Sequence, residues 1–257
     1  MCLIVFSHNH HPVYKLILAA NRDEFYKRPS RAAQFWKNEH HPEILAGQDL
    51  KGKGTWLGIH KDGRWGALTN YRSPLARKKN PPTRGKLVID YLKEEQSARQ
   101  YLDQVHPQSN RFNGFNLLLG DQQGLFHYSN HEQQIHSVAP GIHGISNASL
   151  NTPWPKLKTA RHKLRDITHS DQFEKEELFT LLQNKEKAPM DQLPDTGITP
   201  ELERAVSSIF IKTKSYGTRC STLVLMDYEG NIDFTERRYK AGSTDLKEEN
   251  HYRINKK

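Results

Sequence analysis

The chain has 257 residues, with 38 Lys or Arg against 29 Asp or Glu, which gives a formal net charge of +9. This length fits one domain with a single core, and no apolar run approaches the ~18 residues of a membrane-spanning helix. The two cysteines are too few for a disulfide scaffold, and no motif interleaves basic and aromatic residues for nucleic-acid binding. Without a secretory signal, these features predict a cytoplasmic protein with no stable membrane insertion.

The N-terminal segment predicts a β-hairpin. Leu3 to Ser7 is an apolar, strand-like run, and Tyr14 to Ala20 is a second one after a turn rich in His and Pro. Strands of similar length joined by a short loop bring the end of the hairpin back to its beginning. Arg22 and Asp23, which follow the second strand, are therefore expected near Cys2.

The rest of the chain alternates groups of strands with groups of helices. Apolar positions recur at helical spacing from Arg84 to about Val105, and Pro155 is typical of a first helical turn. The expected strands are 55–59, 64–69, 115–119, 125–129, 134–138, 218–226 and 232–238, and the expected helices are 84–105, 155–169, 174–183 and 200–207. Antiparallel strand groups with helices collected between them predict an α+β fold. We expect one domain over residues 1–241 and a polar, mobile tail over residues 242–257.

Cys2 follows the initiator methionine directly. If Met1 is removed, one Cα carries both a thiol nucleophile and an α-amine, whose reference pKa of about 7.7–8.0 lets it take the thiol proton. If Met1 stays, the amine is acylated and cannot act as this base. The alternative interpretation is a packed strand residue, since free cysteine is among the most buried residue types.

Several motifs occur together, in order, between Met1 and about Tyr239. They are Met1-Cys2, Asn21-Arg22-Asp23-Glu24, Gly54-Thr55-Trp56-Leu57-Gly58, Leu68-Thr69-Asn70-Tyr71-Arg72, Arg84-Gly85-Lys86-Leu87, Gly114-Phe115-Asn116-Leu117, Ser146-Asn147, Pro153-Trp154-Pro155-Lys156 and Tyr216-Gly217-Thr218-Arg219. This set resembles the NRDE family, whose eukaryotic members are called transport and Golgi organisation proteins. The family is similar to N-terminal nucleophile hydrolases and, more distantly, to penicillin V acylases and choloylglycine hydrolases.

The resemblance implies a four-layer αββα sandwich of two antiparallel sheets between helices. It also implies a set of catalytic residues, which are Cys2, Arg22, Asp23, Asn70, Asn147 and Arg219. Tyr71 and Arg72 are implied as substrate-binding residues. In these roles the two arginines lower the thiol pKa, Asp23 holds the α-amine, and the asparagines donate to the oxyanion. Each residue also has a structural alternative, as an ion pair closing the hairpin, a turn residue or a strand anchor.

Cys220 and the loop histidines are two further groups with the potential for chemistry. Cys220 is expected to face away from the site, because neighbouring strand residues point to opposite faces of a sheet. A disulfide between Cys2 and Cys220 is accordingly not expected. The loop histidines have no convincing metal-ligand spacing and are interpreted as solvated, with contact to haem or a metal as the alternative: His8, His10, His11, His40 and His41.

The sequence therefore supports two hypotheses about function. The first is an amidohydrolase that cleaves linear, non-peptide C–N bonds through a thioester acyl-enzyme, with no metal and no cofactor. The alternative is a haem-trafficking or carrier protein that binds a haem-like anionic ligand in the same pocket without catalysis, since a fold does not fix a function. The sequence predicts no oligomeric state.

Overall fold

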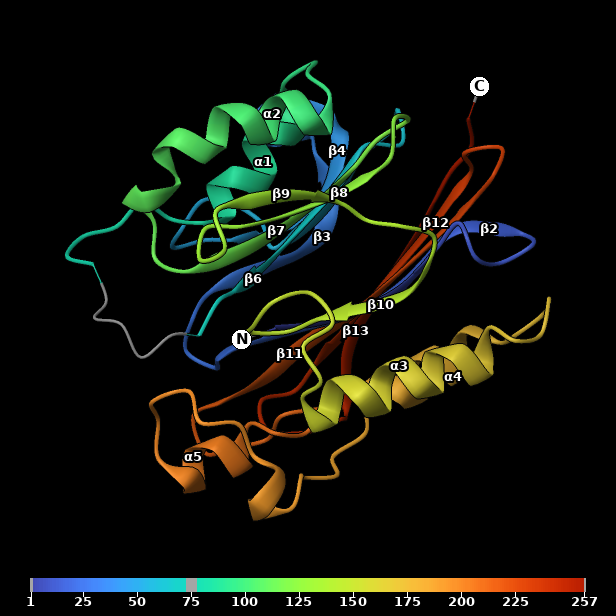
Figure 1. Cartoon of the computed structure of the whole chain (residues 1–257). Coiled ribbons are helices and arrows are strands. Elements are labelled where there is room, and N and C mark those ends of the chain that lie inside the picture. Colours follow the sequence, from blue (N-terminus) through green and yellow to red (C-terminus); the bar gives the residue numbers. More distant parts are fainter. Residues whose placement is uncertain (1, 73–77, 257) are drawn as a thin grey trace. The chain divides into compact units, whose positions relative to one another are not determined.

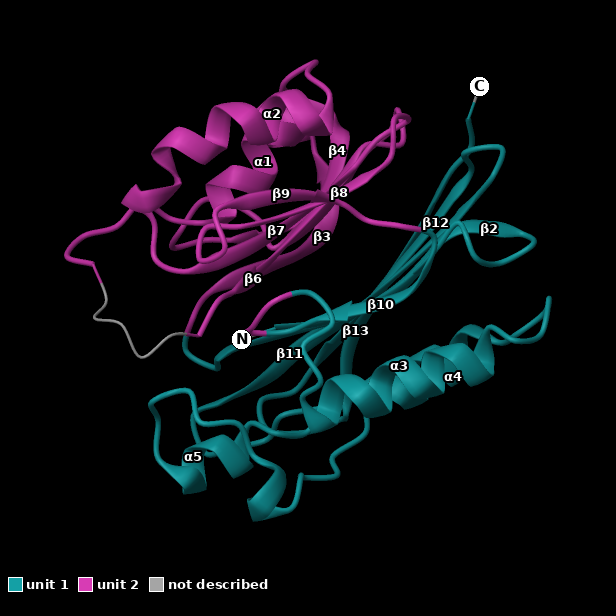
Figure 2. Ribbon diagram, viewed as in Figure 1, with its two compact units in different colours: residues 1–27, 140–146, 150–257 teal, residues 28–139, 147–149 magenta. Residues whose placement is uncertain are grey.

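The computed structural model describes residues 2–72 and 78–256, and the contacts divide the chain into two compact units (Figure 2). Unit 1 comprises residues 1–27, 140–146 and 150–257, and unit 2 comprises residues 28–139 and 147–149. Neither unit is a continuous stretch of sequence. The expectation of a single domain over residues 1–241 stays a prediction. Met1, whose removal the sequence leaves open, lies outside the described residues.

Unit 1 is built on an antiparallel sheet with the strand order β10-β1-β2-β11-β12-β13. Its strands are β1 (Cys2–His8), β2 (Tyr14–Phe25), β10 (Gly141–Ile145), β11 (Tyr216–Asp227), β12 (Ile232–Tyr239) and β13 (Leu246–Ile254). Its helices are α3 (Pro155–Ile167), α4 (Lys175–Leu182) and α5 (Pro200–Ala205), with a 3₁₀ turn, η3 (Met190–Gln192). The helices α3 and α4 run along one face of the sheet (Figure 1).

The core of unit 1 lies between that sheet face and the helices α3 and α4. Alternate residues of the strands point toward the helices, as the period of two along a strand requires. The buried set includes Leu3, Val5, Ile17, Ala19, Leu223 and Leu225 from the strands, and Leu157, Ala160, Leu164, Leu178, Phe179, Leu181 and Leu182 from the helices.

Unit 2 is built on a second antiparallel sheet, with the order β3-β4-β5-β6-β7-β8-β9. Its strands are β3 (Ser30–Trp36), β4 (His41–Asp49), β5 (Leu57–His60), β6 (Trp65–Asn70), β7 (Phe115–Gly120), β8 (Leu125–Ser129) and β9 (Gln134–Ser137). Its helices are α1 (Gly85–Lys93) and α2 (Ala98–Val105), with 3₁₀ turns η1 (Lys37–Glu39) and η2 (His106–Arg111).

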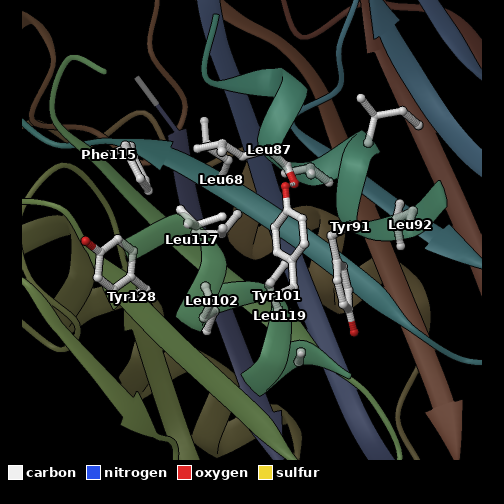
Figure 3. Packing of buried hydrophobic residues seen from close by; sticks show 14 of the residues in the cluster. Leu68, Leu87, Tyr91, Leu92, Tyr101, Leu102, Phe115, Leu117, Leu119 and Tyr128 are labelled. Atoms are coloured by element: carbon white, nitrogen blue, oxygen red, sulfur yellow. Dashed lines mark hydrogen bonds between the residues drawn. The ribbon is translucent and has the colours of Figure 1, made fainter. Parts of the chain in front are cut away.

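Helices α1 and α2 of unit 2 pack on its sheet through a second hydrophobic core (Figure 3). Tyr101 lies beside Leu87, and its hydroxyl donates to the Leu87 carbonyl at 2.9 Å. Tyr91 donates in the same way to the Gly120 carbonyl at 3.1 Å. Each buried tyrosine thus satisfies its hydroxyl on backbone, so that its ring can contribute apolar packing.

The predicted fold class is confirmed, because each unit combines an antiparallel sheet with helices. The N-terminal hairpin is confirmed too, with β1 and β2 paired along their length. Within the described residues, no helix is both long and apolar enough to cross a membrane.

The predicted continuous helix from Arg84 to Val105 is wrong. The chain becomes extended at Glu94, and a new helix begins after Ser97. Ser97 and Gln100 form a capping box, in which each side chain accepts a hydrogen bond from the other's backbone N–H. This arrangement gives hydrogen-bond partners to N–H groups that are unpaired at the start of a helix. A second helix therefore begins after Ser97, although the apolar spacing alone predicts that the first helix continues through this point.

The predicted mobile tail from residue 242 is also wrong for most of its length. Leu246–Ile254 forms β13, which pairs with β12 from Ile232↔Ile254 to Tyr239↔Leu246. Charged partners add to the backbone ladder: Asp233 accepts from His251 at 2.9 Å, and Arg238 pairs with Glu248 at 3.0 Å. Polarity is compatible with an edge strand, because charged residues are common on sheet edges.

Candidate functional site

Cys2, Arg22 and Cys220 form a row across three neighbouring strands of unit 1. Cys2 on β1 lies opposite Arg22 on β2, and Arg22 lies opposite Cys220 on β11. Residues directly opposite one another in antiparallel strands share a sheet face. The Arg22 side chain, only 5% exposed, therefore lies on the same face as both cysteines, which are free thiols.

The predicted outward orientation of Cys220 is wrong, and a β-bulge is the reason. Thr218 pairs with Asp23 and Cys220 pairs with Arg22, so Arg219 is an extra residue between two consecutive pairs of the ladder. A bulge interrupts the alternation of faces. Arg219 keeps a position at this end of the sheet, where its Nη1 donates to the Phe25 carbonyl at 2.9 Å.

Asp23 is a buried carboxylate on the opposite face of β2. Its side chain is 2% exposed, and its Oδ1 accepts a hydrogen bond from Thr218 Oγ1 at 2.7 Å. Burial raises the pKa of Asp23, whereas the positive charges of Lys156 and Arg22 and the Thr218 bond act in the opposite direction. Asp23 also follows Arg22 directly in β2, and Arg22 is the residue that pairs with Cys2 on β1.

The Cys2 thiol is protonated at neutral pH. Burial raises its pKa, and the negative charge of Asp23 raises it further, while the Asp23 backbone hydrogen bond and the Arg22 charge lower it. The expected lowering by Arg22 is thus present but smaller than the effect of burial. A thiol in this state needs a base to become a nucleophile, and α-amines have the appropriate pKa range.

Ser146 is a contact of the site to which sequence reasoning gave no role. Its Oγ donates to the Cys2 carbonyl at 3.0 Å, and its side chain is buried. The bond joins the end of β10 to the first residue of β1 and fixes the backbone that carries the thiol. The Ser146-Asn147 motif was the available sequence signal. Only the pairing of β10 with β1 shows that the partner of Ser146 is the Cys2 carbonyl.

The other four candidates lie together in unit 2. Asn147 Nδ2 donates to the Asn70 carbonyl at 2.7 Å, and the Asn147 carbonyl accepts from the Arg72 N–H at 2.7 Å. Tyr71 stacks on His131 with ring centroids 4.3 Å apart. The structure therefore brings Asn70, Tyr71, Arg72 and Asn147 together in one unit, and Cys2, Arg22, Asp23 and Arg219 together in the other.

Of the histidines predicted to be solvated, His10 and His40 are exposed and His41 is partly exposed, but His8 and His11 are buried. His8 is packed at the end of β1, where burial, followed by Lys15 and His143, lowers its pKa to about 4. His11 Nδ1 accepts from the backbone N–H groups of Val13 and Tyr14, and its Nε2 contacts the Ser170 carbonyl. Over residues 2–72 and 78–256, no group of three or more His, Cys, Asp or Glu side chains is arranged to hold a metal ion.

Comparison with solved structures defines the class of fold. The Caenorhabditis elegans N-acylethanolamine-hydrolyzing acid amidase ortholog superposes with a TM-score of 0.52 at 9% identity, covering 87% of this chain and 92% of that one. The fold is that of the N-terminal nucleophile hydrolases.

Comparison of sequences defines the family. The chain is 37% identical to the Transport and Golgi organization 2 homolog of Mus musculus over 98% of both chains, and 38% identical to the Homo sapiens homolog over 92% of both. The family model described as Transport and Golgi organisation 2 matches residues 1–241. The chain belongs to this family, which confirms the resemblance drawn from its motifs.

Proposed function

We propose that the protein is an N-terminal-cysteine hydrolase that cleaves linear, non-peptide amide bonds through a thioester acyl-enzyme. The supporting observation is the position of Cys2, the first residue of β1, directly opposite Arg22 and next to Asp23 on the neighbouring strand β2. Removal of Met1 would release an α-amine on the same Cα as a thiol that burial keeps protonated. The nucleophile and its base would then need no further residue.

The first half of the reaction follows from these groups. The α-amine accepts the thiol proton while the sulfur adds to the amide carbonyl carbon, and Asn70 and Asn147 are the proposed donors to the oxyanion. Collapse of the tetrahedral intermediate breaks the C–N bond. The departing nitrogen takes the proton from the α-ammonium group and leaves as an amine, and the acyl group remains as a thioester on Cys2.

The second half restores the enzyme. The α-amine takes a proton from water as the water oxygen attacks the thioester carbonyl, and the C–S bond then breaks. The sulfur recovers its proton and the acyl group leaves as a carboxylic acid. Arg22 and Arg219 place positive charge near the sulfur, Asp23 holds the α-amine, and Tyr71 and Arg72 are proposed to bind the substrate.

The proposed substrate class is taken from a protein of the same fold. The name of the Caenorhabditis elegans protein states that it hydrolyses N-acylethanolamines, which are linear amides outside the peptide backbone. We propose the same broad class of bond here, with the acyl group and the amine left open. An amide panel should therefore vary both halves of the substrate.

The decisive variant is Cys2→Ala in the mature protein. It removes only the sulfur, so we expect turnover of any accepted amide to fall by at least about 1,000-fold. Cys220→Ala is the matched control, because Cys220 is a second thiol on the same face, beside Arg22, that has no part in the proposed chemistry. Equal turnover by Cys2→Ala and wild-type protein would refute the proposal.

Mass spectrometry tests the same proposal without kinetics. The intact protein should lack its initiator methionine, and a slowly hydrolysed amide or an activated ester should add one acyl group to the peptide that begins with Cys2. The added mass should be lost on treatment with hydroxylamine, which cleaves thioesters. A retained Met1 in the active protein would exclude the α-amine as the base.

The alternative of haem binding without catalysis leads to different results. It predicts a saturable change in the haem absorption band at micromolar protein and no amide turnover by the wild type. The histidine-rich turn gives it little support, because His8 and His11 are buried and His11 already has backbone partners on both ring nitrogens. The hydrolase is therefore the function that we put forward.

A further inference from the structure

The C-terminal strand β13 has little apolar attachment to the rest of unit 1. It lies at the edge of the sheet, next to β12. Within residues 246–254, all of which the structure describes, Ile254 is the only buried side chain, and Leu246 at the other end of the strand is 49% exposed. Burial of apolar surface therefore contributes little to the attachment of this strand. The family model that matches the chain ends at residue 241, before β13 begins.

Charge pairs join β13 to β12 in addition to the backbone ladder. They are Arg237 with Glu249 at 2.5 Å, Arg238 with Glu248 at 3.0 Å, and Asp233 with Arg253 at 3.6 Å and with His251 at 2.9 Å, the last an ion pair when the imidazole is protonated. Because neighbouring strand residues point to opposite faces, Arg237 and Arg238 place such pairs on both faces of the sheet. The β13 partners are exposed to solvent, so dissolved salt screens these pairs.

The same charged groups of β12 also bind α4. Arg237 pairs with Glu176 at 2.8 Å, and its guanidinium carbon lies 3.8 Å from the centroid of the Phe179 ring. Asp233 pairs with Lys175 at 2.5 Å. Arg237 and Asp233 therefore each keep a partner of opposite charge when β13 leaves, which avoids the penalty of a partly buried charge without a partner. The contacts between α4 and the sheet do not depend on β13.

We propose that β13 is a releasable strap, which detaches from β12 as a unit when salt screens its charge pairs, while the other strands of the unit 1 sheet stay paired. Detachment exposes the backbone edge of β12. An open edge of this kind pairs with extended segments of other chains. The strap thus couples the ionic strength of the surroundings to the exposure of a sheet edge, and it does so whether or not the protein is a hydrolase.

Hydrogen exchange of the full chain, followed by mass spectrometry at constant pH and temperature, tests the proposal. When NaCl is raised from about 50 mM to about 500 mM, we expect the amides of residues 246–254 to exchange about tenfold faster or more. Exchange in β11, and in β9 at an edge of the unit 2 sheet, should change by less than about twofold. Protection of β13 that does not respond to salt, or that is lost only together with the protection of β11, would overturn the proposal.

Two matched variants separate the strap from the helix. Glu249 and Glu176 both pair with Arg237, but only Glu249 belongs to β13. Glu249→Gln should speed the exchange of β13 at low salt by about threefold and weaken its response to salt. Glu176→Gln should leave β13 exchange close to that of the wild type. Equal acceleration by the two variants would contradict the proposal, and the salt series on the wild type tests it without any substitution.

Discussion

Asn21 opens the tetrapeptide Asn21-Arg22-Asp23-Glu24, yet its contacts are those of a structural residue. Its Nδ2 donates to the carbonyls of Leu182 and Ile209 at 2.8 and 3.0 Å, and its Oδ1 accepts from Ser221 Oγ. A single buried amide therefore joins β2 to α4, to the segment before β11 and to β11 itself. The motif thus combines a residue that fixes the strand with Arg22, which lies on the sheet face of Cys2, and Asp23, which lies on the opposite face.

We predict that Asn21→Ala lowers the free energy of unfolding by about 3 kcal/mol, because it leaves two buried carbonyls without a donor. Ser221→Ala removes one hydrogen bond to the same amide and also the bond that Ser221 Oγ accepts from the Tyr239 hydroxyl at 3.0 Å, and it should cost about 2 kcal/mol. Urea unfolding monitored by tryptophan fluorescence measures both values. Similar small losses for the two variants would show that the Asn21 amide does not bridge these elements.

At the scale of elements, two glycines allow the start of α1 to approach the segment that leads into β5. A Cβ on Gly54 would lie 2.3 Å from the Gly85 carbonyl carbon, and one on Gly85 would lie 2.9 Å from the Thr55 carbonyl oxygen. The Thr55 N–H donates to the Gly85 carbonyl at 3.1 Å across this contact. The two sequence motifs that contain Gly54 and Gly85 therefore meet in space and hold the first helix of unit 2.

We predict that Gly54→Ala destabilises the protein by about 2 kcal/mol or more, since the backbone of Gly85 must move to admit a methyl group. Gly52→Ala is the matched control, because a Cβ there would meet its nearest neighbour at 3.4 Å, an ordinary contact. That variant should stay within about 1 kcal/mol of the wild type. Thermal or urea unfolding of the pair checks this, and equal stabilities would contradict the close approach.

Many helices and strands could be predicted because the residue patterns that mark them lie within a short stretch of sequence. The hairpin of β1 and β2 and the proximity of Cys2 and Arg22 follow from strand length and a short turn. The break between α1 and α2 was missed because apolar spacing continues across it and only the capping box at Ser97 marks it. The strand β13 was missed because its residues are polar, and pairing with β12, not burial, makes them a strand.

The candidate site was predictable to the same extent. The placement of Asp23 near Cys2 follows from the hairpin, and the register of β1 against β2 agrees with it. The sheet face on which Cys220 lies was not predictable. A single bulge at Arg219 shifts the alternation of side-chain faces along β11, and no local sequence pattern marks that bulge.

At the scale of the whole molecule, each unit holds a buried, neutral histidine. His127 in unit 2 contacts Asn116 Oδ1 at 3.3 Å, and burial, opposed by Glu132 and aided by His136, lowers its pKa to about 4. The Asn116 amide group already donates to Thr69 Oγ1 and to the Ala148 carbonyl, so the His127 Nε2–H is assigned as the donor. His8 in unit 1 has a pKa of about 4 as well.

We predict that stability is lost as the pH falls from about 6.5 toward 4. In this window the unfolded histidines bind protons while the folded ones stay neutral, so acid favours the unfolded state. For His127, a pKa difference of about 2.5 corresponds to about 3 kcal/mol. The stability of His127→Gln, measured by urea unfolding between pH 7.5 and 4.5, should therefore fall less steeply than that of the wild type. Parallel pH profiles would show that His127 does not titrate on unfolding.

Between Ser146 and Leu150 the chain leaves one unit for three residues and then comes back (Figure 2). Those three residues supply the Asn147 amide to the Asn70 carbonyl and the Ala148 carbonyl to Asn116. A gene fragment encoding residues 28–139 would omit them and strip Asn70 and Asn116 of these partners. Dissection of this protein by excised fragments would thus damage the part being studied, and point substitutions in the intact polypeptide are the sound way to assign its working residues.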